Sequence, residues 1–418
     1  MSASEFHSFG CRLNTAETAI MKSQAAASQL DNTIVFNTCA VTSEAVRQAR
    51  QAIRKARRER PEAHIVVTGC AAQTGPDEFA RMKEVDLVLG NEEKFNPALY
   101  SRTEIHKTAV VKVGDILSQT RMNTPSLSGF GERARAFVQV QNGCDHRCTF
   151  CIIPFGRGNA RSARPGQILG QIRDLVERGY REIVLTGVDI TAYGPDLDPD
   201  LTLGDLVAQI LRQTPGLERL RLSSLDPVET DMKLLRLFGE DHRLLPHLHL
   251  SLQAGDNLVL KRMKRRHTRE DAMEFCENLR KIRPGIVFGA DLIAGFPTET
   301  EAMFENTIKL VKDCGLTFLH VFPFSARPQT PAANMPQLEG PVIRNRAKRL
   351  RETGDAARSR YLTSLIGKTR QVLVESDDRG FTEHFAPVQL DSPARPGSIL
   401  KVNITGATPA NCKGRVLA

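Results

Sequence analysis

Short apolar runs alternate with amphipathic helical patterns along most of this chain. In the first hundred residues the apolar runs cover 6–9, 33–36, 64–68 and 85–89, and the helical patterns cover 13–30, 44–60 and 77–83. Neighbouring parallel strands need a crossover connection, usually a helix, so this order predicts a parallel sheet covered by helices. We expect an open parallel α/β domain over residues 1–105.

The alternation resumes, with longer repeats, after a weakly periodic stretch at 106–135 that indicates a linker. Six apolar runs follow, at 136–141, 182–186, 217–223, 247–252, 286–293 and 317–322. Six repeats favour a partial (β/α)6 barrel over a closed eightfold one, and sites in such sheets form at the carboxyl ends of the strands. This central domain is expected over residues 130–365.

The end of the chain changes character. A basic helical pattern at 341–366 is followed by short β runs at 371–375 and 399–404, separated by Gly, Pro and Asp. Short strands spaced by turn residues predict a small antiparallel β-barrel over residues 366–418.

Positive charge is concentrated in two segments of a chain whose net charge is +9. Residues 44–60 and 341–360 each carry seven basic and two acidic side chains. Arg47, Arg50, Arg54 and Arg58 recur at helical spacing and form a stripe that suits nucleic-acid phosphates or, equally, a solvated helix face.

The cellular setting follows from the cysteines and from hydropathy. The chain has nine cysteines, and an odd number without a visible secretory signal favours metal binding or catalysis over a disulfide framework. No run approaches the ~20 apolar residues of a membrane span. We expect a cytoplasmic protein with no membrane partner, and the sequence leaves its oligomeric state open.

Cys144, Cys148 and Cys151 form a C-x3-C-x2-C loop directly after the first strand of the central domain. Three thiolates on one loop can hold three irons of a cubane cluster and leave the fourth iron without a protein ligand. A structural zinc would normally need a fourth ligand, which His146 could supply only from an awkward position inside the loop.

Cys11, Cys39 and Cys70 each follow a predicted strand of the N-terminal domain. The ends of parallel strands meet at one edge, so these cysteines can converge on a second three-thiolate site, although separately buried thiols remain an alternative. Cys276 fits a helical core stripe, Cys314 a helix end, and Cys412 shows no partner pattern.

The stretch 138–158, VQVQNGCDHRCTFCIIPFGRG, resembles the radical S-adenosylmethionine enzymes. Together with the three N-terminal cysteines it resembles the methylthiotransferases, and the end of the chain resembles a TRAM domain. The resemblance implies two [4Fe-4S] clusters. Cys144, Cys148 and Cys151 would ligate the radical-generating cluster, which binds S-adenosylmethionine, and Cys11, Cys39 and Cys70 would ligate an auxiliary cluster. An electron donor such as flavodoxin or ferredoxin is also implied.

Other strand ends match the cofactor-binding positions of this family less tightly. They are Gly187 and Asp189 in the segment Thr-Gly-Val-Asp, and Ser223, Gln253 and Asp291. We expect them to contact S-adenosylmethionine, although each also fits a capping or turn role.

The segments Gly-Cys-Arg-Leu-Asn at 10–14 and GRGNARSAR at 156–164 resemble the branch that acts on threonylcarbamoyladenosine. That branch would methylthiolate carbon 2 of this nucleoside beside the anticodon, with the tRNA anticodon loop as partner. Arg157, Arg161 or Arg164 could pair with the threonyl carboxylate, or with phosphate or solvent. The alternatives are isopentenyladenosine in tRNA, a ribosomal-protein aspartate, or a zinc-stabilised RNA-binding protein without catalysis.

Overall fold

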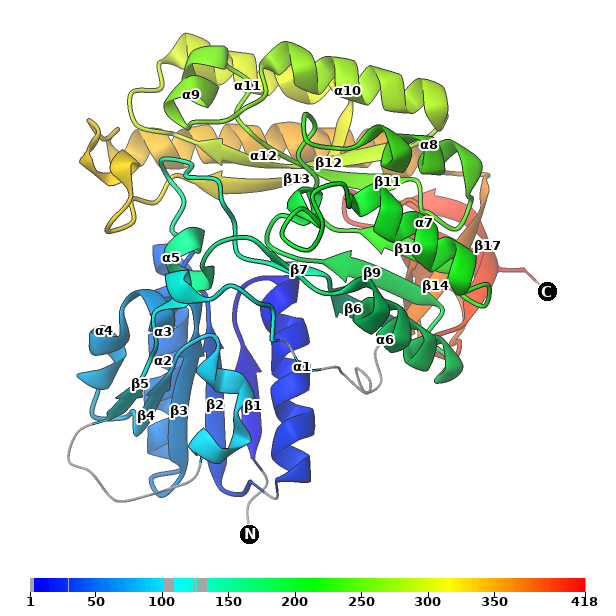
Figure 1. Ribbon diagram of the computed structural model, residues 1–418. Helices are drawn as coiled ribbons and strands as arrows, with labels where there is room; N and C mark the ends of the chain where they lie inside the picture. The colour runs from blue at the N-terminus through cyan, green and yellow to red at the C-terminus, as the bar shows by residue number, and fades with distance from the viewer. Residues whose placement is uncertain (1–3, 29, 101–108, 124, 126–133, 418) are drawn as a thin grey trace.

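The N-terminal unit is a five-stranded parallel sheet. The structure is a computed structural model that describes residues 4–28, 30–100, 109–123, 125 and 134–417 (Figure 1). The strands lie in the order β1 (Glu5–Ser8), β2 (Thr33–Thr38), β3 (His64–Gly69), β4 (Leu87–Leu89), β5 (Val110–Lys112). The first four match the expected apolar runs. The fifth pairs Val110 with Leu87, although it falls within the stretch expected to be a linker.

Helices cover both faces of this sheet. They are α1 (Arg12–Ala27), α2 (Ser43–Glu59), α3 (Cys70–Thr74) and α4 (Pro76–Ala80), with 3-10 turns η1 (Glu93–Phe95), η2 (Pro97–Tyr100) and η3 (Ile116–Ser118). Met21 of α1 packs against Val35 and Val66 on one face, whereas Ile53 of α2 packs against the opposite face. Successive strand residues point to opposite faces, so a sheet covered on both sides needs strands that are apolar throughout.

The central unit contains two three-stranded parallel sheets instead of one continuous sheet. The first has the order β10 (Arg219–Leu222), β9 (Glu182–Thr186), β6 (Arg135–Gln139), and the second has the order β11 (His247–Gln253), β12 (Val287–Ala294), β13 (Leu316–Pro323). Two isolated parallel bridges, from Leu220 to Leu244 and from Leu225 to Leu250, connect them.

Helices between these strands complete the βα repeats that the sequence predicts. They are α6 (Pro165–Glu177), α7 (Leu203–Gln213), α8 (Met232–Glu240), α9 (Asn257–Arg262), α10 (Arg269–Ile282) and α11 (Glu301–Asp313). Shorter elements are β7 (Gln141–Asn142), β8 (Arg161–Ser162), α5 (Ile153–Arg157), η4 (Ile190–Ala192) and η5 (Pro331–Asn334). Capping boxes begin α7 and α10, at Thr202 and Thr268.

One apolar core joins the N-terminal and central units. Ala16 and Ile20 of α1 pack in the same cluster as Ala136 and Val138 of β6. The N-terminal sheet is therefore docked on the central unit along α1, with its strand ends directed toward the cysteine loop (Figure 1).

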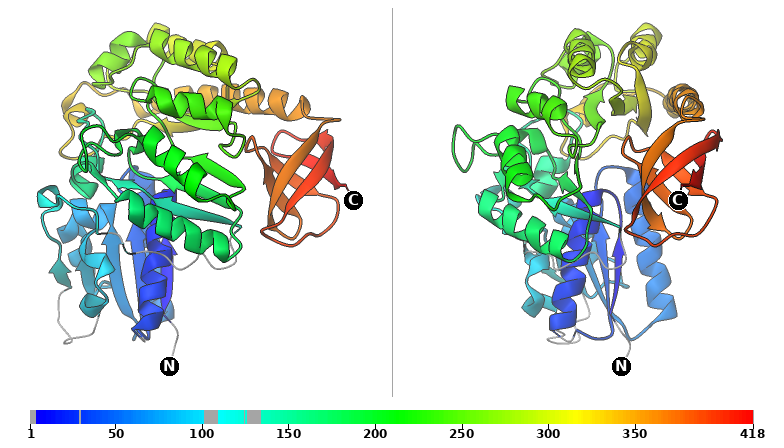
Figure 2. Two further views of the ribbon diagram at one scale, coloured as in Figure 1. Left: turned by 45° about the vertical axis from the view of Figure 1, so that its right-hand side comes forward. Right: turned by 90° about the vertical axis from the view of Figure 1, so that its right-hand side faces the viewer.

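The C-terminal unit is a closed five-stranded barrel in the order β14 (Thr369–Ser376), β15 (Arg379–Thr382), β16 (Pro387–Leu390), β18 (Cys412–Val416), β17 (Ile399–Ala407). The expected small barrel is confirmed, although β16 and β18 pair in parallel. It is reached through the long basic helix α12 (Gly340–Thr363) (Figure 2). No helix in the described part of the chain is long and apolar enough to cross a membrane.

Candidate active site

The loop that carries Cys144, Cys148 and Cys151 is held by backbone contacts on two sides. The Cys144 amide donates to the Gly158 carbonyl at 3.0 Å, and the Thr149 amide donates to the Met263 carbonyl at 3.1 Å. A Cβ atom on Gly143, whose φ is +72°, would lie 1.8 Å from a neighbouring backbone oxygen, so only glycine fits at the start of the loop.

Charged groups surround this loop. Cys144 Sγ lies 3.7 Å from Asp189 Oδ2, and Arg265 Nη1 lies 3.8 Å from Cys148 Sγ. His146 Nε2 lies 3.0 Å from a carboxylate oxygen of Asp189 and from one of Glu229. Burial raises the pKa of Cys144, and burial raises the pKa of Cys151 to about 12. A metal centre bound here must therefore displace the thiol protons.

The other three cysteines lie together at one edge of the N-terminal sheet. Cys11 precedes α1, Cys39 follows β2, and Cys70 begins α3 directly after β3. A Cβ on Gly10, whose φ is +94°, would lie 2.7 Å from Cys39 Sγ, so a glycine lets the two loops approach. Burial, and then the neighbouring thiol of Cys70, raises the pKa of Cys39 to about 12. What these cysteines bind stays a prediction.

The two cysteine sets differ from the compact groups of potential metal ligands in this structure. Among the described residues, the groups of three ligand atoms within 4.8 Å of one another are Cys144–His146–Asp189 and His249–Asp291–His320. Neither set of three thiols meets this distance, whereas tetrahedral Zn–S bonds of about 2.3 Å place sulfurs only about 3.8 Å apart. Each donor set consists of three thiols, and soft thiolates are the ligands that suit iron–sulfur clusters.

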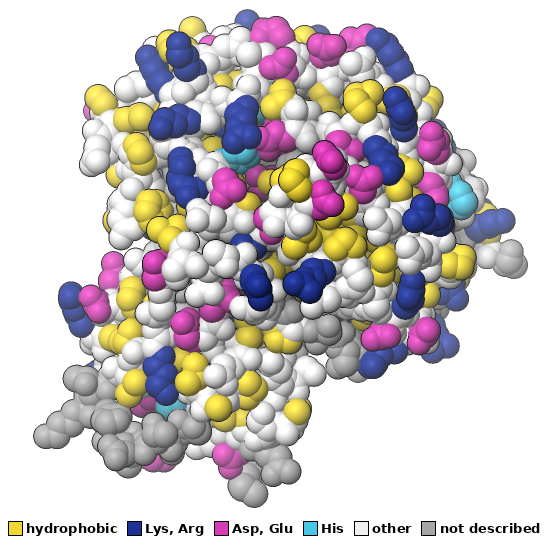
Figure 3. Space-filling model, in the orientation of Figure 1, with side chains coloured by type: hydrophobic (Ala, Val, Ile, Leu, Met, Phe, Trp, Pro, Cys, Tyr) yellow, Lys and Arg dark blue, Asp and Glu magenta, His cyan; other side chains and the backbone are white. Residues whose placement is uncertain are grey.

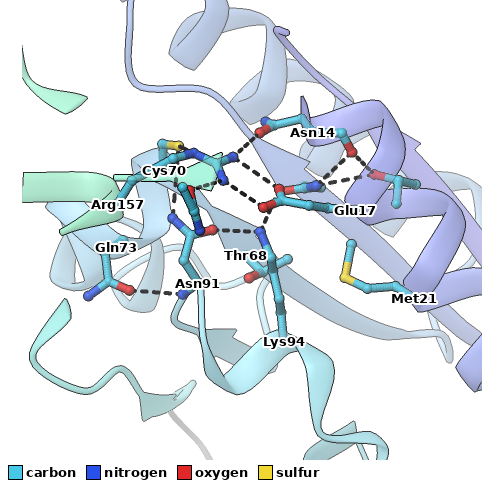
Figure 4. A network of polar contacts seen from close by, with 12 residues as sticks. Asn14, Glu17, Met21, Thr68, Cys70, Gln73, Asn91, Lys94 and Arg157 are labelled. Carbon is cyan, nitrogen blue, oxygen red and sulfur yellow. Dashed lines mark hydrogen bonds and ion pairs between the residues drawn. The ribbon is translucent and has the colours of Figure 1, made fainter. Parts of the chain in front are cut away.

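A buried polar network surrounds Arg157, which follows the 144–151 loop at the end of α5 and contacts Cys70 of the N-terminal set (Figure 4). Its Nε donates to Cys70 Sγ at 3.2 Å, its Nη1 to Glu17 Oε1 at 2.6 Å, and its Nη2 to Asn14 Oδ1 at 2.6 Å. Lys94 Nζ, which is fully buried, donates to Glu17 Oε2 at 2.7 Å. Burial alone would raise the pKa of Glu17, but Arg157 and Lys94 lower it to about 2. Glu17 is therefore an ionised carboxylate between two buried cations.

Replacing Glu17 by alanine is expected to destabilise the protein by about 3–5 kcal/mol, because two buried cations lose their shared counter-ion. The measurement is equilibrium denaturation of wild type and variant under anaerobic conditions. Glu44→Ala is the matched control, since Glu44 pairs with Arg47 on an exposed helix face and its loss should leave the midpoint unchanged. Equal midpoints for Glu17→Ala and wild type would contradict the structural role of the network.

Two of the arginines that could receive the threonyl carboxylate are buried and paired within the chain. Arg157 is 2% exposed and paired with Glu17, and Arg161 is 1% exposed and lies 3.2 Å from Glu92 Oε1. Both guanidinium groups are already engaged by carboxylates of this chain. A threonyl carboxylate would have to displace these internal partners, which disfavours both arginines as its binding residue. Arg164 is exposed and precedes α6.

The strand-end residues expected to contact S-adenosylmethionine are distributed over two neighbourhoods. Gly187 and Asp189 lie with the cysteine loop: a Cβ on Gly187 would be 2.8 Å from the Gln141 carbonyl, and the Asp189 amide donates to Gln141 Oε1 at 2.8 Å. Ser223 follows β10, and its amide donates to Leu185. These contacts do not test cofactor binding, which stays a prediction for these residues.

The second neighbourhood contains two histidines that the sequence argument missed. Asp291 Oδ1 lies 2.9 Å from His249 Nε2 and 3.2 Å from His320 Nδ1. These residues come from β12, β11 and β13, so they line one face of the second sheet. Gln253 ends β11 with φ of +69°, a left-handed conformation that glycine usually adopts.

The basic stripe of α2 borders a groove of about 450 Å³ that also includes Arg327, from the segment after β13. Arg47 and Arg50 pair with Glu44 and Glu78, which reduces the net charge of the groove. On the face shown in Figure 3, basic and acidic side chains are interspersed over the central unit.

Two family models match the chain. Residues 138–311 match the Radical SAM superfamily, and residues 4–90 match the Uncharacterized protein family UPF0004. The chain is also similar to solved structures of the radical S-adenosylmethionine methyltransferase TsrM from Kitasatospora setae. The form with cobalamin and a [4Fe-4S] cluster aligns with a TM-score of 0.58 at 16% identity, over 79% of this chain and 77% of that one. At this identity the similarity shows the fold alone.

Curated relatives align over nearly the whole length. Threonylcarbamoyladenosine tRNA methylthiotransferase MtaB of Rickettsia prowazekii is 48% identical over 96% of this chain and 94% of its own. MtaB of Bacillus subtilis is 33% identical, over 97% and 94%. The tRNA-2-methylthio-N(6)-dimethylallyladenosine synthase of Cereibacter sphaeroides is also 33% identical, over 98% and 97%. The chain therefore belongs to the radical S-adenosylmethionine methylthiotransferase family.

Proposed function

We propose that this protein methylthiolates carbon 2 of threonylcarbamoyladenosine next to the anticodon in tRNA. The observation that carries the proposal is the juxtaposition of two three-cysteine sites. Gly156 and Arg157 follow the cysteine loop, and both touch Cys70 of the other set. A Cβ on Gly156 would lie 3.3 Å from Cys70 Cβ, and Arg157 donates to Cys70 Sγ. The relative with 48% identity supports this nucleoside over the dimethylallyl one.

Cys144, Cys148 and Cys151 would hold a [4Fe-4S] cluster with one iron open to S-adenosylmethionine. When bound there, the cluster and S-adenosylmethionine would supply radical chemistry to the site, with a flavodoxin- or ferredoxin-like protein as the electron donor. The chain's residues bind and orient the cofactor. In this proposal Gly187 leaves room for S-adenosylmethionine to approach the backbone closely. Polar contacts with S-adenosylmethionine are made by Asp189, Ser223, Gln253 and Asp291. The two three-stranded sheets would act as one partial (β/α)6 barrel around it.

Cys11, Cys39 and Cys70 would hold a second [4Fe-4S] cluster, which would carry the sulfur. Arg157, which donates to Cys70 Sγ at 3.2 Å, would orient this ligand from the side. The surrounding network of Asn14, Glu17 and Lys94 is buried, and it would keep this side of the site free of water. We place the activity in the cytoplasm, where tRNA is modified.

The test is mass spectrometry of tRNA nucleosides from a strain without this gene, complemented with wild type or with Cys148→Ala. Loss of methylthiolated threonylcarbamoyladenosine, restored by wild type alone, is the expected result. Methylthiolated dimethylallyladenosine in the same digests is the internal control and should not change. If that nucleoside responds instead, the substrate is the dimethylallyl one; if neither responds, the proposed tRNA activity is wrong.

A further inference from the structure

Arg12 is a partly buried cation without a polar partner among the described residues. It follows Cys11 directly, and its guanidinium carbon lies 5.4 Å from the centre of the Phe385 ring of the C-terminal barrel. Within the described ranges its guanidinium makes neither a hydrogen bond nor an ion pair. A charge withdrawn from water without a counter-ion is costly, so such a group indicates a missing anion.

Two further arginines lie close to Arg12. The guanidinium carbons of Arg135 and Arg221 lie 5.2 and 5.0 Å from the centre of the same Phe385 ring. Burial, and then repulsion from Arg135 and Arg221, lowers the pKa of Arg12 to about 10. Three guanidinium groups therefore lie around one aromatic ring at this junction.

The nearby carboxylates are already used by other residues. Glu182 accepts a hydrogen bond from Arg221 Nε at 2.8 Å and also pairs with Arg219 and Arg135. Arg135 in addition pairs with Glu375 of the C-terminal barrel. Asp291, whose charge also acts on Arg12, is bonded to His249 and His320.

Arg12 lies next to one of the N-terminal cysteines and close to the central unit. The start of α1 carries Cys11 on one side, among the cysteines of the N-terminal sheet. The charge of Asp291, on β12 of the central unit, acts on Arg12. A nucleoside whose carbon 2 approaches the N-terminal cysteines from the central unit would therefore bring its other substituents close to Arg12.

We propose that Arg12 binds the free carboxylate of the threonyl group and thereby selects the threonylcarbamoyl nucleoside. This inference rests on the proposed function. The threonylcarbamoyl group carries a carboxylate, whereas the dimethylallyl group is a hydrocarbon, so a guanidinium without an internal partner discriminates between them. Guanidinium binds carboxylate through two parallel hydrogen bonds, and Arg157 and Arg161 are already engaged.

The experiment compares two synthetic anticodon stem-loops, one with threonylcarbamoyladenosine and one with its threonyl methyl ester. Reconstituted wild type should lose about 10- to 100-fold in kcat/KM on the ester, the loss typical of a charged hydrogen-bond partner. Arg12→Ala should lose a similar factor on the acid and show no further loss on the ester. The kcat/KM of Arg12→Lys on the acid stem-loop should lie between those of wild type and Arg12→Ala, because lysine keeps the positive charge but cannot form two parallel hydrogen bonds.

Controls separate this effect from damage to the neighbouring cysteine site. Iron content, the visible absorption spectrum and tRNA-independent 5′-deoxyadenosine formation should match wild type in every Arg12 variant. Arg212→Ala, an exposed arginine on α7, should behave as wild type on both stem-loops. Loss of iron in Arg12→Ala would show a structural role instead and overturn the assignment.

Two results would contradict the carboxylate assignment itself. If the ester penalty is as large in Arg12→Ala as in wild type, Arg12 does not contact the carboxylate. If Arg12→Ala weakens both stem-loops equally and makes binding less dependent on salt, Arg12 contacts an RNA phosphate. Failure of wild type to methylthiolate the acid stem-loop would refute the proposed function and is distinguishable from both.

Discussion

Cys148→Ala is expected to abolish 5′-deoxyadenosine formation from S-adenosylmethionine. Cys148 is buried within the loop, and only Cys144 and Cys151 remain as thiols on it. Two thiolates cannot hold three irons of a cubane, so the radical-generating cluster should not assemble. The measurement is 5′-deoxyadenosine by mass spectrometry after anaerobic reconstitution and reduction, together with iron per chain, which should fall by about half if both proposed clusters form.

Cys276→Ala is the matched control for this experiment. Cys276 is also a buried cysteine, but it lies on α10 in the apolar core beside Ala272 and Leu279. Its replacement should leave 5′-deoxyadenosine formation unchanged. Cleavage retained by Cys148→Ala would sink the assignment of the loop. Zinc in place of iron in wild type would revive the non-catalytic alternative.

The parts of the fold that the sequence predicts are those encoded locally. Apolar runs of four to eight residues, mostly followed by an amphipathic pattern, specify parallel strands and their crossover helices without reference to distant segments. Placement of Cys11, Cys39 and Cys70 directly after such runs was sufficient to predict that they share one edge of a sheet. The loop at 144–151 could be recognised for a similar reason, since its three cysteines lie close together in sequence.

The features that the sequence does not predict depend on contacts between residues that are far apart in the chain. Val110–Lys112 is a three-residue strand that completes the first sheet only because Leu87–Leu89 offers it an edge. Glu17 looked like any polar residue of an amphipathic helix. Its partners are Lys94, 77 positions away, and Arg157, 140 positions away. No local pattern distinguishes a buried arginine with an internal counter-ion from an exposed one, so the sequence left carboxylate, phosphate and solvent open as partners of Arg157 and Arg161.

The same limit applies to the break between the two central sheets. The spacing of six βα repeats predicts how many strands there are, but it does not show whether β10 and β11 pair along their length. There the structure has two isolated bridges instead of a continuous ladder. His249 and His320 were likewise overlooked, because only the register of β11, β12 and β13 brings them to Asp291.

Cys39→Ala, unlike Cys148→Ala, should still form 5′-deoxyadenosine. It should form no methylthiolated nucleoside. Cys39 lies against Gly10 and near Cys70, whereas the 144–151 loop is held separately by Gly158 and Met263. Removing one thiol from the N-terminal set should therefore leave the radical-generating loop intact.

The readout for Cys39→Ala is the ratio of methylthiolated nucleoside to 5′-deoxyadenosine in one reaction with threonylcarbamoyladenosine tRNA. This ratio should fall at least about 100-fold, since the difference between three ligands and two decides whether a cluster assembles. Cys412→Ala, a buried cysteine of the C-terminal barrel, should keep the wild-type ratio. A wild-type ratio in Cys39→Ala would remove the second cluster from the mechanism and leave Cys11, Cys39 and Cys70 as packing residues. Loss of both products would mean that the two sites do not assemble independently. The contacts of Arg157 and Gly156 with Cys70 would then be the physical reason, because they join the two sites.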